Sequence, residues 1–158
     1  MRYWKINLQN NKSVLISGAN GMIGSFLYTR FHKNYFITTI DYDRASIEEN
    51  FFPLDLTQEE DVETFAEKSL KFDLLIFLVG LAHKKGKGKE LDEFRRVNKQ
   101  TLMNLLSKLD KKNKLPGKII FASTISVYGE KMNKNIYNED SSKNPFSPYA
   151  VTKLEAEE

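Results

Sequence analysis

The sequence predicts an α/β protein built on a doubly wound parallel sheet of about five strands. Short runs rich in β-branched and aromatic residues alternate with longer stretches of helical periodicity along the chain, which is typical of a parallel sheet covered by helices. A glycine-rich turn follows the first of these runs. The 158 residues contain no repeat and no Gly/Ser linker, so we expect residues 1–158 to form one domain.

Five runs are expected to be strands. They are residues 13–17, 35–41, 50–55, 73–79 and 117–123.

One helix is expected between the first and second strands, and another between the third and fourth. The first has apolar residues at helical spacing, namely Met22, Ile23, Phe26, Leu27 and Phe31. The second is expected to begin at Thr57 as N-cap, with Glu60 three residues later completing a capping box.

Two more helices follow in the second half of the chain. An apolar stripe predicts the longest helix over 90–113. The last helix should begin at Ser147 as N-cap with Pro148 in its first turn. The loop HKKGKGK (83–89) before the long helix is either a solvated connection or a cationic rim that attracts an anionic substrate.

Composition narrows the classes of function. No apolar run approaches the roughly 20 residues of a membrane span, and the N-terminus lacks the apolar segment of a signal peptide, so we expect a cytoplasmic protein with no membrane partner. The chain has no cysteine and only two histidines, His32 and His83, so no disulfide and no metal site are expected. A net charge of +3 gives no support for a nucleic-acid partner.

The glycine-rich turn has the spacing of a dinucleotide-binding loop. Gly18 can turn tightly, Gly21 lets the backbone approach a pyrophosphate, and Gly24 lets the following helix pack closely. The N-terminus of this helix would then direct backbone N–H groups at the anion, including those of Met22 and Ile23. Asn20 would lie beside the bound anion. A tight turn without a ligand has the same local pattern.

An acidic residue ends the second strand, 17 residues after Gly24. The Asp41 carboxylate is placed to accept hydrogen bonds from both ribose hydroxyls of adenosine. Its charge favours NAD over NADP, although Arg44 could soften that preference. No glycine is followed by Lys-Ser or Lys-Thr, which disfavours a P-loop NTPase.

The ends of the third and fourth strands supply further candidate cofactor contacts. Asp55 could bind the adenine amino group with Leu56 beside the ring, or could simply precede a helix. Gly80, Leu81 and Ala82 could let a nicotinamide ribose pass, or could form an ordinary turn.

The candidate chemistry lies in the last third of the chain. Tyr149 and Lys153 are four residues apart on one predicted helical face, so an ammonium can stabilise a nearby phenolate. A tyrosine acting as a base near neutrality needs its pKa lowered by about 3 units from ~10. Ser123 and Thr124 follow the fifth strand at the sheet edge where such folds bind ligands. Capping and turn hydrogen bonds are their ordinary alternative.

These segments together resemble the extended short-chain dehydrogenase/reductase family, in particular its NAD-dependent nucleotide-sugar epimerases and dehydratases. The matching stretches are GANGMIG, DL at 55–56, LVGLAH, FRRVN, FASTISVYG and EDSSKNPFSPYAVTKLEAE.

The resemblance implies a Rossmann-type fold, NAD as cofactor and Tyr149 as general base. It also implies that Lys153 holds the cofactor ribose, that Thr124 binds the reacting oxygen, and that Asn98 is a structural residue near the cofactor. The family's remaining cofactor contacts match positions already named, which are Gly18, Asn20, Gly21, Met22, Ile23, Gly24, Asp41, Asp55, Leu56, Gly80, Leu81, Ala82 and Ser123.

One absence narrows the subfamily. Sugar dehydratases of this family carry an acidic pair after the threonine, where this chain has Ile125 and Ser126. The resemblance therefore implies a UDP-sugar 4-epimerase, with a keto-sugar reductase or a non-catalytic nucleotide-binding module as alternatives. Ala150 after Tyr149 and Thr152 before the lysine are mild departures from the family pattern.

Family members are longer than this chain. The resemblance thus predicts a Rossmann domain that stops before the last strands and the C-terminal substrate domain. We expect a homodimer formed through the long helix 90–113 and the terminal helix, or association through an exposed edge of the fifth strand around Ile119 to Phe121.

Overall fold

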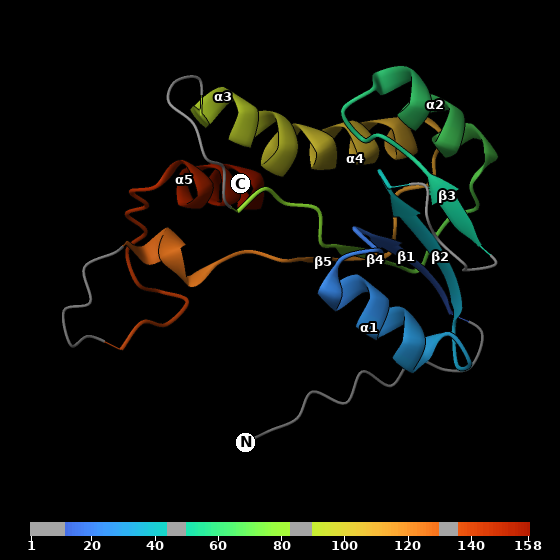
Figure 1. The fold of residues 1–158 in the computed structure, drawn as a ribbon, viewed down its shortest axis with the longest axis horizontal. Helices are drawn as coiled ribbons and strands as arrows, with labels where there is room; N and C mark the ends of the chain where they lie inside the picture. Colours follow the sequence, from blue (N-terminus) through green and yellow to red (C-terminus); the bar gives the residue numbers. More distant parts are fainter. Residues whose placement is uncertain (1–11, 44–49, 83–89, 130–135) are drawn as a thin grey trace.

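A computed structural model describes residues 12–43, 50–82, 90–129 and 136–158. Its five strands form a single parallel sheet in the order β3-β2-β1-β4-β5 (Figure 1). The chain moves outward from β1 to β3 and then crosses to β4 on the other side of β1. This reversal between β1 and β4 is the place where doubly wound sheets bind ligands, and it confirms the predicted fold class.

All five strands lie within their predicted ranges and are mostly shorter. Their bounds are β1 Ser13–Ser17, β2 Phe36–Asp41, β3 Phe51–Pro53, β4 Leu74–Phe77 and β5 Lys118–Phe121. The third strand is half its predicted length because it ends at a proline, which has no N–H to donate to a ladder.

The described helices cover the sheet unequally. They are α1 Met22–Phe31, α2 Glu59–Lys68, α3 Glu90–Arg95, the π-helix η1 Arg96–Gln100, α4 Thr101–Lys111, the 3-10 helix η2 Ile125–Tyr128 and α5 Pro148–Glu157. In Figure 1, α2, α3 and α4 lie on one side of the sheet, and α1 lies on the other. No helix in the part of the chain described here is long and apolar enough to span a membrane.

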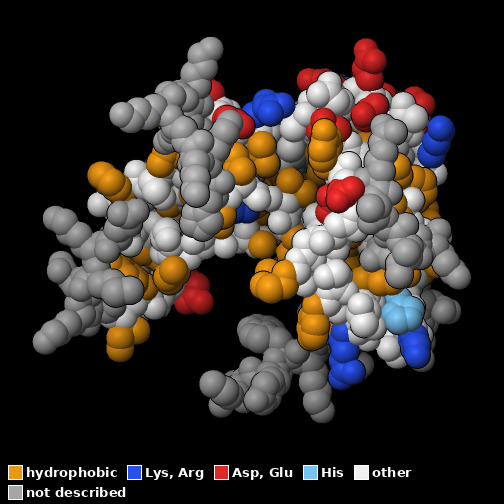
Figure 2. Space-filling view, in the orientation of Figure 1, with side chains coloured by type: hydrophobic (Ala, Val, Ile, Leu, Met, Phe, Trp, Pro, Cys, Tyr) orange, Lys and Arg blue, Asp and Glu red, His pale blue; other side chains and the backbone are white. Residues whose placement is uncertain are grey.

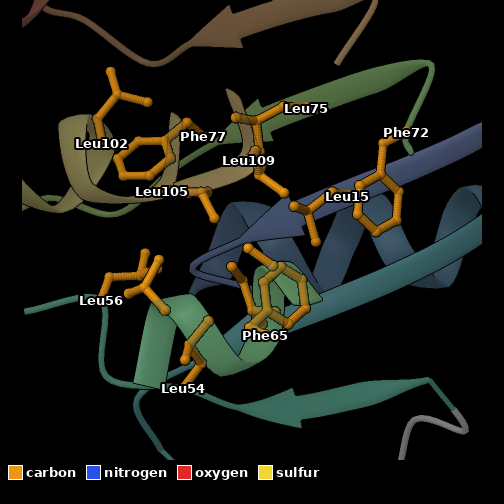
Figure 3. Close-up of a cluster of buried hydrophobic side chains, with 13 residues drawn as sticks. Leu15, Leu54, Leu56, Phe65, Phe72, Leu75, Phe77, Leu102, Leu105 and Leu109 are labelled. Atoms are coloured by element: carbon orange, nitrogen blue, oxygen red, sulfur yellow. The ribbon is translucent and has the colours of Figure 1, made fainter. Parts of the chain in front are cut away.

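The larger core lies between the sheet and the α2–α4 layer. Figure 3 shows Leu15, Leu75 and Phe77 of the sheet meeting Phe65 of α2 and Leu105 of α4. Of these, Leu15, Leu75, Phe77 and Leu105 are completely buried. Burying a leucine or phenylalanine stabilises a fold by about 1.5–3 kcal/mol, so this layer is the main source of stability and fixes where the strand ends lie.

The first predicted helix is confirmed as α1, but most of the apolar residues that predicted it are exposed. Met22, Ile23, Phe26 and Phe31 are 86%, 53%, 66% and 40% exposed, and Gly24 is the buried residue of this helix. The α1 helix packs on the face of the sheet that is opposite to α2, α3 and α4, and it is the one described helix on that face (Figure 1). Leu27 and Tyr28 pack against the smaller core cluster of Val14, Ile16, Ala19, Ile37 and Leu74, and no second helix of the described residues covers the rest of α1.

The predicted capping box at Thr57 is wrong. The second helix begins at Glu59, and its N-cap Gln58 makes no side-chain cap hydrogen bond. The Thr57 hydroxyl instead donates to Asp55 Oδ1 at 2.7 Å, and the Thr57 N–H donates to the same oxygen at 2.9 Å. This local Asx-type bonding competes with helix capping.

The predicted long helix 90–113 is interrupted by the π-helix η1, which lies between α3 and α4. Backbone angles remain helical at both junctions. Short π segments are common at functional sites, and this one contains Asn98, whose side chain is completely buried. The terminal helix follows the prediction, since the Ser147 hydroxyl accepts a hydrogen bond from the Ala150 N–H at 3.2 Å.

The fifth strand is an edge strand that pairs with β4 on one side. Ile119 and Ile120 are 44% and 42% exposed there, which confirms the expected exposed edge. The predicted loop 83–89 and Arg44 lie outside the described residues.

Candidate functional site

The turn after β1 requires glycine at position 18. Gly18 has a φ of +75°, and its N–H donates to Ile40 O at 3.0 Å. A Cβ at this position would lie 3.2 Å from both Leu78 C and Val79 N of the neighbouring strand end. The turn therefore sits at the C-terminal ends of β1, β2 and β4, as the sequence predicts.

The two later glycines shape the start of α1. A Cβ on Gly24 would collide with Gly18 O and lie 2.6 Å from Ala19 Cα, so the helix packs directly on the turn. Gly21 is the N-cap and provides no side-chain cap, and the first turn has no acidic residue. Met22 and Ile23 begin the helix with exposed side chains. This N-terminus thus keeps uncapped N–H groups and a positive dipole end, which suit a diphosphate.

Asp41 joins the glycine turn to the end of β2. Its Oδ2 accepts the Asn20 N–H at 2.9 Å and its Oδ1 accepts the Asp43 N–H at 3.3 Å. The Asn20 amide donates to Asp43 O at 3.2 Å. Each Asp41 oxygen receives one of these bonds and can accept another, so the carboxylate can still bind ribose hydroxyls.

A cavity of about 430 Å³ opens beside Asp41, between the ends of β2 and β3 and the η1 helix. Asp55 and Leu56 line it, as predicted for an adenine site, and so do Val97 and Arg96 of η1. The Asp55 Oδ1 is engaged by Thr57. Both alternatives for Asp55 are therefore compatible with the structure, because its second oxygen can still accept a ligand hydrogen bond.

A second cavity, of about 480 Å³, adjoins the first and shares its Tyr42, Leu54 and Asp55 lining. Asp43 and Asp61 complete its carboxylate rim. Three carboxylates next to Asp41 disfavour an additional phosphate on the ribose by like-charge repulsion, which strengthens the sequence argument for NAD over NADP.

Asn98 fixes the segment after β4. Its Oδ1 accepts the Leu81 N–H at 2.6 Å, while its Nδ2 donates to Leu81 O at 3.2 Å and to Thr152 Oγ1 at 3.0 Å. The residue is completely buried, and its hydrogen bonds join η1 to Leu81 and to Thr152 of α5. Ala82 is exposed beside this segment.

The helix α5 brings Tyr149 and Lys153 to the same strand end as the glycine turn. Lys153 Nζ lies 3.5 Å from Val79 O and 6.0 Å from the centre of the Tyr149 ring. A Cβ on Gly80 would lie 2.9 Å from this Nζ, so Gly80 leaves room for the lysine. Lys153 is 2% exposed, and burial lowers the pKa of its amine from 10.5 to about 8.

Two hydroxyls after β5 are bonded within the protein. The Thr124 Oγ1 accepts the Ser126 N–H at 3.3 Å and caps η2. The Ser123 hydroxyl donates to a Glu157 oxygen of α5. Ser123 therefore contacts α5 directly, and Thr124 caps the helix η2 that packs against α5. These are ordinary turn and capping hydrogen bonds. Figure 2 shows this face hollowed between η2 and α1, with hydrophobic side chains along the sides of the hollow.

Sequence reasoning missed several residues around the site. Arg96, Val97 and Thr101 line the 430 Å³ cavity beside Asp41, and Phe121 lies against Lys153. The spacing of Val97 and Thr101, one helical turn apart, could have indicated a shared face. Arg96 and Phe121 carry no such signal, since their places depend on the π-helix and on the register of β5.

Comparisons with known proteins agree with this geometry. Residues 14–158 match the model of the NAD dependent epimerase/dehydratase family. Among curated proteins, N-acetyl-alpha-D-glucosaminyl-diphospho-ditrans,octacis-undecaprenol 4-epimerase of Escherichia coli O157:H7 is 28% identical, over 94% of this chain and 42% of its own. The uncharacterised UDP-glucose epimerase YtcB of Bacillus subtilis strain 168 is 31% identical, over 91% of this chain and 49% of its own.

A solved structure has the same arrangement. The UDP-Glc/GlcNAc 4-epimerase of Campylobacter jejuni superposes with a TM-score of 0.78 at 26% identity, covering 92% of this chain and 47% of that one. The chain spans about half the length of the relatives it matches. The family model matches nearly the whole chain, and the parallel sheet agrees with it, as do the glycine turn and the helix that carries Tyr149 and Lys153. The chain belongs to the NAD dependent epimerase/dehydratase family.

Proposed function

We propose that these residues form the cofactor-binding portion of a UDP-sugar 4-epimerase, with Thr124, Tyr149 and Lys153 as its catalytic residues. The observation that carries the proposal is that the glycine turn and Lys153 both contact the backbone of Val79. Gly18 packs against the backbone of this residue on one side, and Lys153 Nζ lies 3.5 Å from its carbonyl oxygen on the other. A dinucleotide cradled by the glycine turn would therefore have a path along the ends of β1 and β4 toward α5.

The described residues fit NAD. The uncapped N-terminus of α1 suits the diphosphate, Asp41 suits the adenosine ribose, and the 430 Å³ cavity suits adenine. When bound, NAD supplies a reversible hydride acceptor. Lys153 is placed to hold the second ribose and to keep a positive charge beside Tyr149, because an amine with a pKa of about 8 is still mainly protonated at pH 7.

The proposed chemistry is a proton transfer coupled to hydride transfer. The Tyr149 phenolate takes the proton of a sugar hydroxyl while the hydrogen on the same carbon leaves as hydride. Thr124 donates a hydrogen bond to the oxygen that becomes a carbonyl. Return of the hydride to the opposite face, with return of the proton from Tyr149, inverts the carbon with no net redox change.

Two features support a 4-epimerase of a sugar diphosphate. Two of the relatives described above are named as 4-epimerases, and two are named for UDP-sugars. The residues after Thr124 are Ile125 and Ser126, which provide no acid and base to eliminate water as a dehydratase must. We propose that the groups recognising the sugar lie mainly outside the cofactor-binding portion.

The test is Tyr149→Phe in the whole gene product that contains these residues. UDP-glucose and UDP-N-acetylglucosamine are each incubated with catalytic NAD, and the 4-epimers are followed by proton NMR together with the absorbance of reduced nicotinamide. We expect interconversion to fall by about 10²–10⁴-fold, while the affinity for NAD, measured by calorimetry, stays within threefold. Phe52→Leu, a β3 residue packed on Phe65 of α2, serves as control.

Two results would contradict the proposal. Stoichiometric consumption of reduced nicotinamide with a keto-sugar would indicate a reductase on the same fold. Interconversion that survives Tyr149→Phe would remove the catalytic role of this residue. Biological activity that survives without any interconversion would favour a non-catalytic nucleotide-binding module.

A further inference from the structure

Lys153 is a buried cation with few polar neighbours. Its Nζ has one carbonyl, Val79 O, at the long distance of 3.5 Å. Burial is the cause of its lowered pKa, and no charged residue in the described ranges contributes to the shift. Burying an ammonium without an anionic partner is costly, so a further group that stabilises the charge helps to hold it in place.

Nearby acids are engaged elsewhere. On the same helix, Glu155 binds Arg95 at 2.7 Å and lies 3.8 Å from Lys99. Glu157 accepts from Ser123 and binds Lys143 at 3.1 Å.

The remaining neighbours of Lys153 in the described ranges are neutral. The η1 helix contributes the amide of Asn98, which is bonded to Leu81 and Thr152. On α5 itself the Tyr149 ring centre is 6.0 Å away, and β4 ends near Gly80.

Besides the Val79 carbonyl, an aromatic face lies close to the ammonium. Lys153 Nζ lies over the ring of Phe121, 4.6 Å from its centre. A cation within about 6 Å of a ring centroid is attracted by the negative face of the ring. The cation therefore has an aromatic partner in place of an anionic one.

The fold holds this ring in a defined place. Phe121 is the last residue of β5 and pairs in register with Phe77 of β4. Their ring centres are 6.2 Å apart with a 32° tilt, and Phe77 is completely buried. On the other side, a Cβ on Gly80 would lie 3.4 Å from Lys153 Cε. The lysine thus lies close to both Gly80 and the Phe121 ring.

We propose that Phe121 is a positioning residue whose ring face holds the Lys153 ammonium at the end of β4, in the place where an ion pair would use a carboxylate. The proposal rests on the catalytic role proposed for Lys153. A carboxylate would neutralise the cation and draw it away from Tyr149. The ring holds the cation and leaves its charge available to the phenolate and to the cofactor ribose.

A direct titration of Lys153 tests this. The chain is labelled with lysine carrying ¹³C at Cε, and the Lys153 signal is identified by its loss in Lys153→Met. Because the ring favours the charged amine, Phe121→Leu should lower the Lys153 pKa by about one unit. Phe121→Tyr keeps the ring face and should leave the pKa within about 0.3 units. The matched control Phe52→Leu removes a ring at the other end of the sheet and should also leave it unchanged.

A second variant separates electrostatics from packing. Replacing Phe121 with 3,4,5-trifluorophenylalanine keeps the ring but withdraws the negative charge from its face, and it should lower the Lys153 pKa in the same direction as Phe121→Leu. The fluorinated variant also tests the proposal if Phe121→Leu fails to fold, because it keeps the size and shape of the ring. A Lys153 pKa that stays the same in the fluorinated protein overturns the proposal. This result is independent of the Tyr149→Phe assay, since it needs no turnover.

Discussion

At the scale of single residues, the most informative position is Lys153, where function and stability are opposed. An ordinary lysine in the unfolded chain has a pKa near 10.5, whereas burial lowers that of Lys153 to about 8. The unfolded chain therefore binds this proton more tightly than the folded protein does. The charged amine destabilises the fold at neutral pH, and the partial compensation from Phe121 does not change the sign.

We expect Lys153→Met to stabilise the fold at pH 7 while removing the proposed catalysis. The pKa difference corresponds to at most about 3 kcal/mol in the free energy of unfolding, so Tm is expected to rise, by up to about 10 °C. Thermal unfolding followed by circular dichroism measures it. Lys118→Met, at an exposed lysine that begins β5, is the control and should leave Tm unchanged.

The pH dependence gives this prediction a second readout. From about pH 8 to 10.5 the wild-type protein should gain stability relative to Lys153→Met, because its folded state loses the proton before the unfolded state does. The stability difference between the two proteins should narrow accordingly. A difference that is constant over this range would contradict the assigned pKa.

At the scale of elements, one lysine after α4 ties that helix to α2. The α4 helix ends in a Schellman-type turn, with Asn113 at a φ of +56° and the Lys114 N–H donating to Leu109 O at 2.8 Å. Lys114 Nζ then donates to Ala66 O, Glu67 O and Ser69 O at 2.9, 2.8 and 2.6 Å. The cation thus satisfies the last carbonyls of α2, where the helix dipole is negative.

Lys114→Met should destabilise the α2–α4 layer. Loss of these charge-assisted hydrogen bonds is expected to cost about 1.5 kcal/mol in the free energy of unfolding and to lower Tm by about 3–6 °C. Urea unfolding and calorimetry measure the two quantities. Lys111→Met removes the same charge from an exposed position at the end of α4, so an equal loss in that control would show that net charge, and not capping, is responsible.

At the scale of the whole molecule, the exposed edge of β5 is the feature with consequences for assembly. The strand pairs on one side with β4 and keeps Ile119 and Ile120 more than 40% exposed. Apolar edge strands invite pairing with another chain, and a lysine on such an edge opposes it.

We expect Ile119→Lys to reduce self-association of the 158-residue chain. Sedimentation velocity at several concentrations measures the fraction of larger species, and circular dichroism confirms folding. Ile136→Lys makes the same change at a residue that is 96% exposed and outside the sheet, and it should leave association unchanged. A dimer that persists in Ile119→Lys would instead favour the interface expected through the long helix and α5.

The features that the sequence determined by itself are those that depend on residues close together along the chain. Alternating strand and helix patterns predicted the element order, the spacing of Gly18 and Gly24 predicted a turn that only glycine can make, and Ser147 with Pro148 predicted the start of α5. All of these depend on short stretches of chain, where sterics and hydrogen bonding act between near neighbours.

Tertiary structure decided the rest. The exposure of Phe26 depends on which helices share its face of the sheet. The π-helix accommodates a buried Asn98 that bonds to Leu81 and Thr152, and the place of Phe121 beside Lys153 depends on the register of β4 and β5. These contacts join residues that are distant in sequence, and pairing of that kind is set by packing of the whole sheet, which no local pattern encodes.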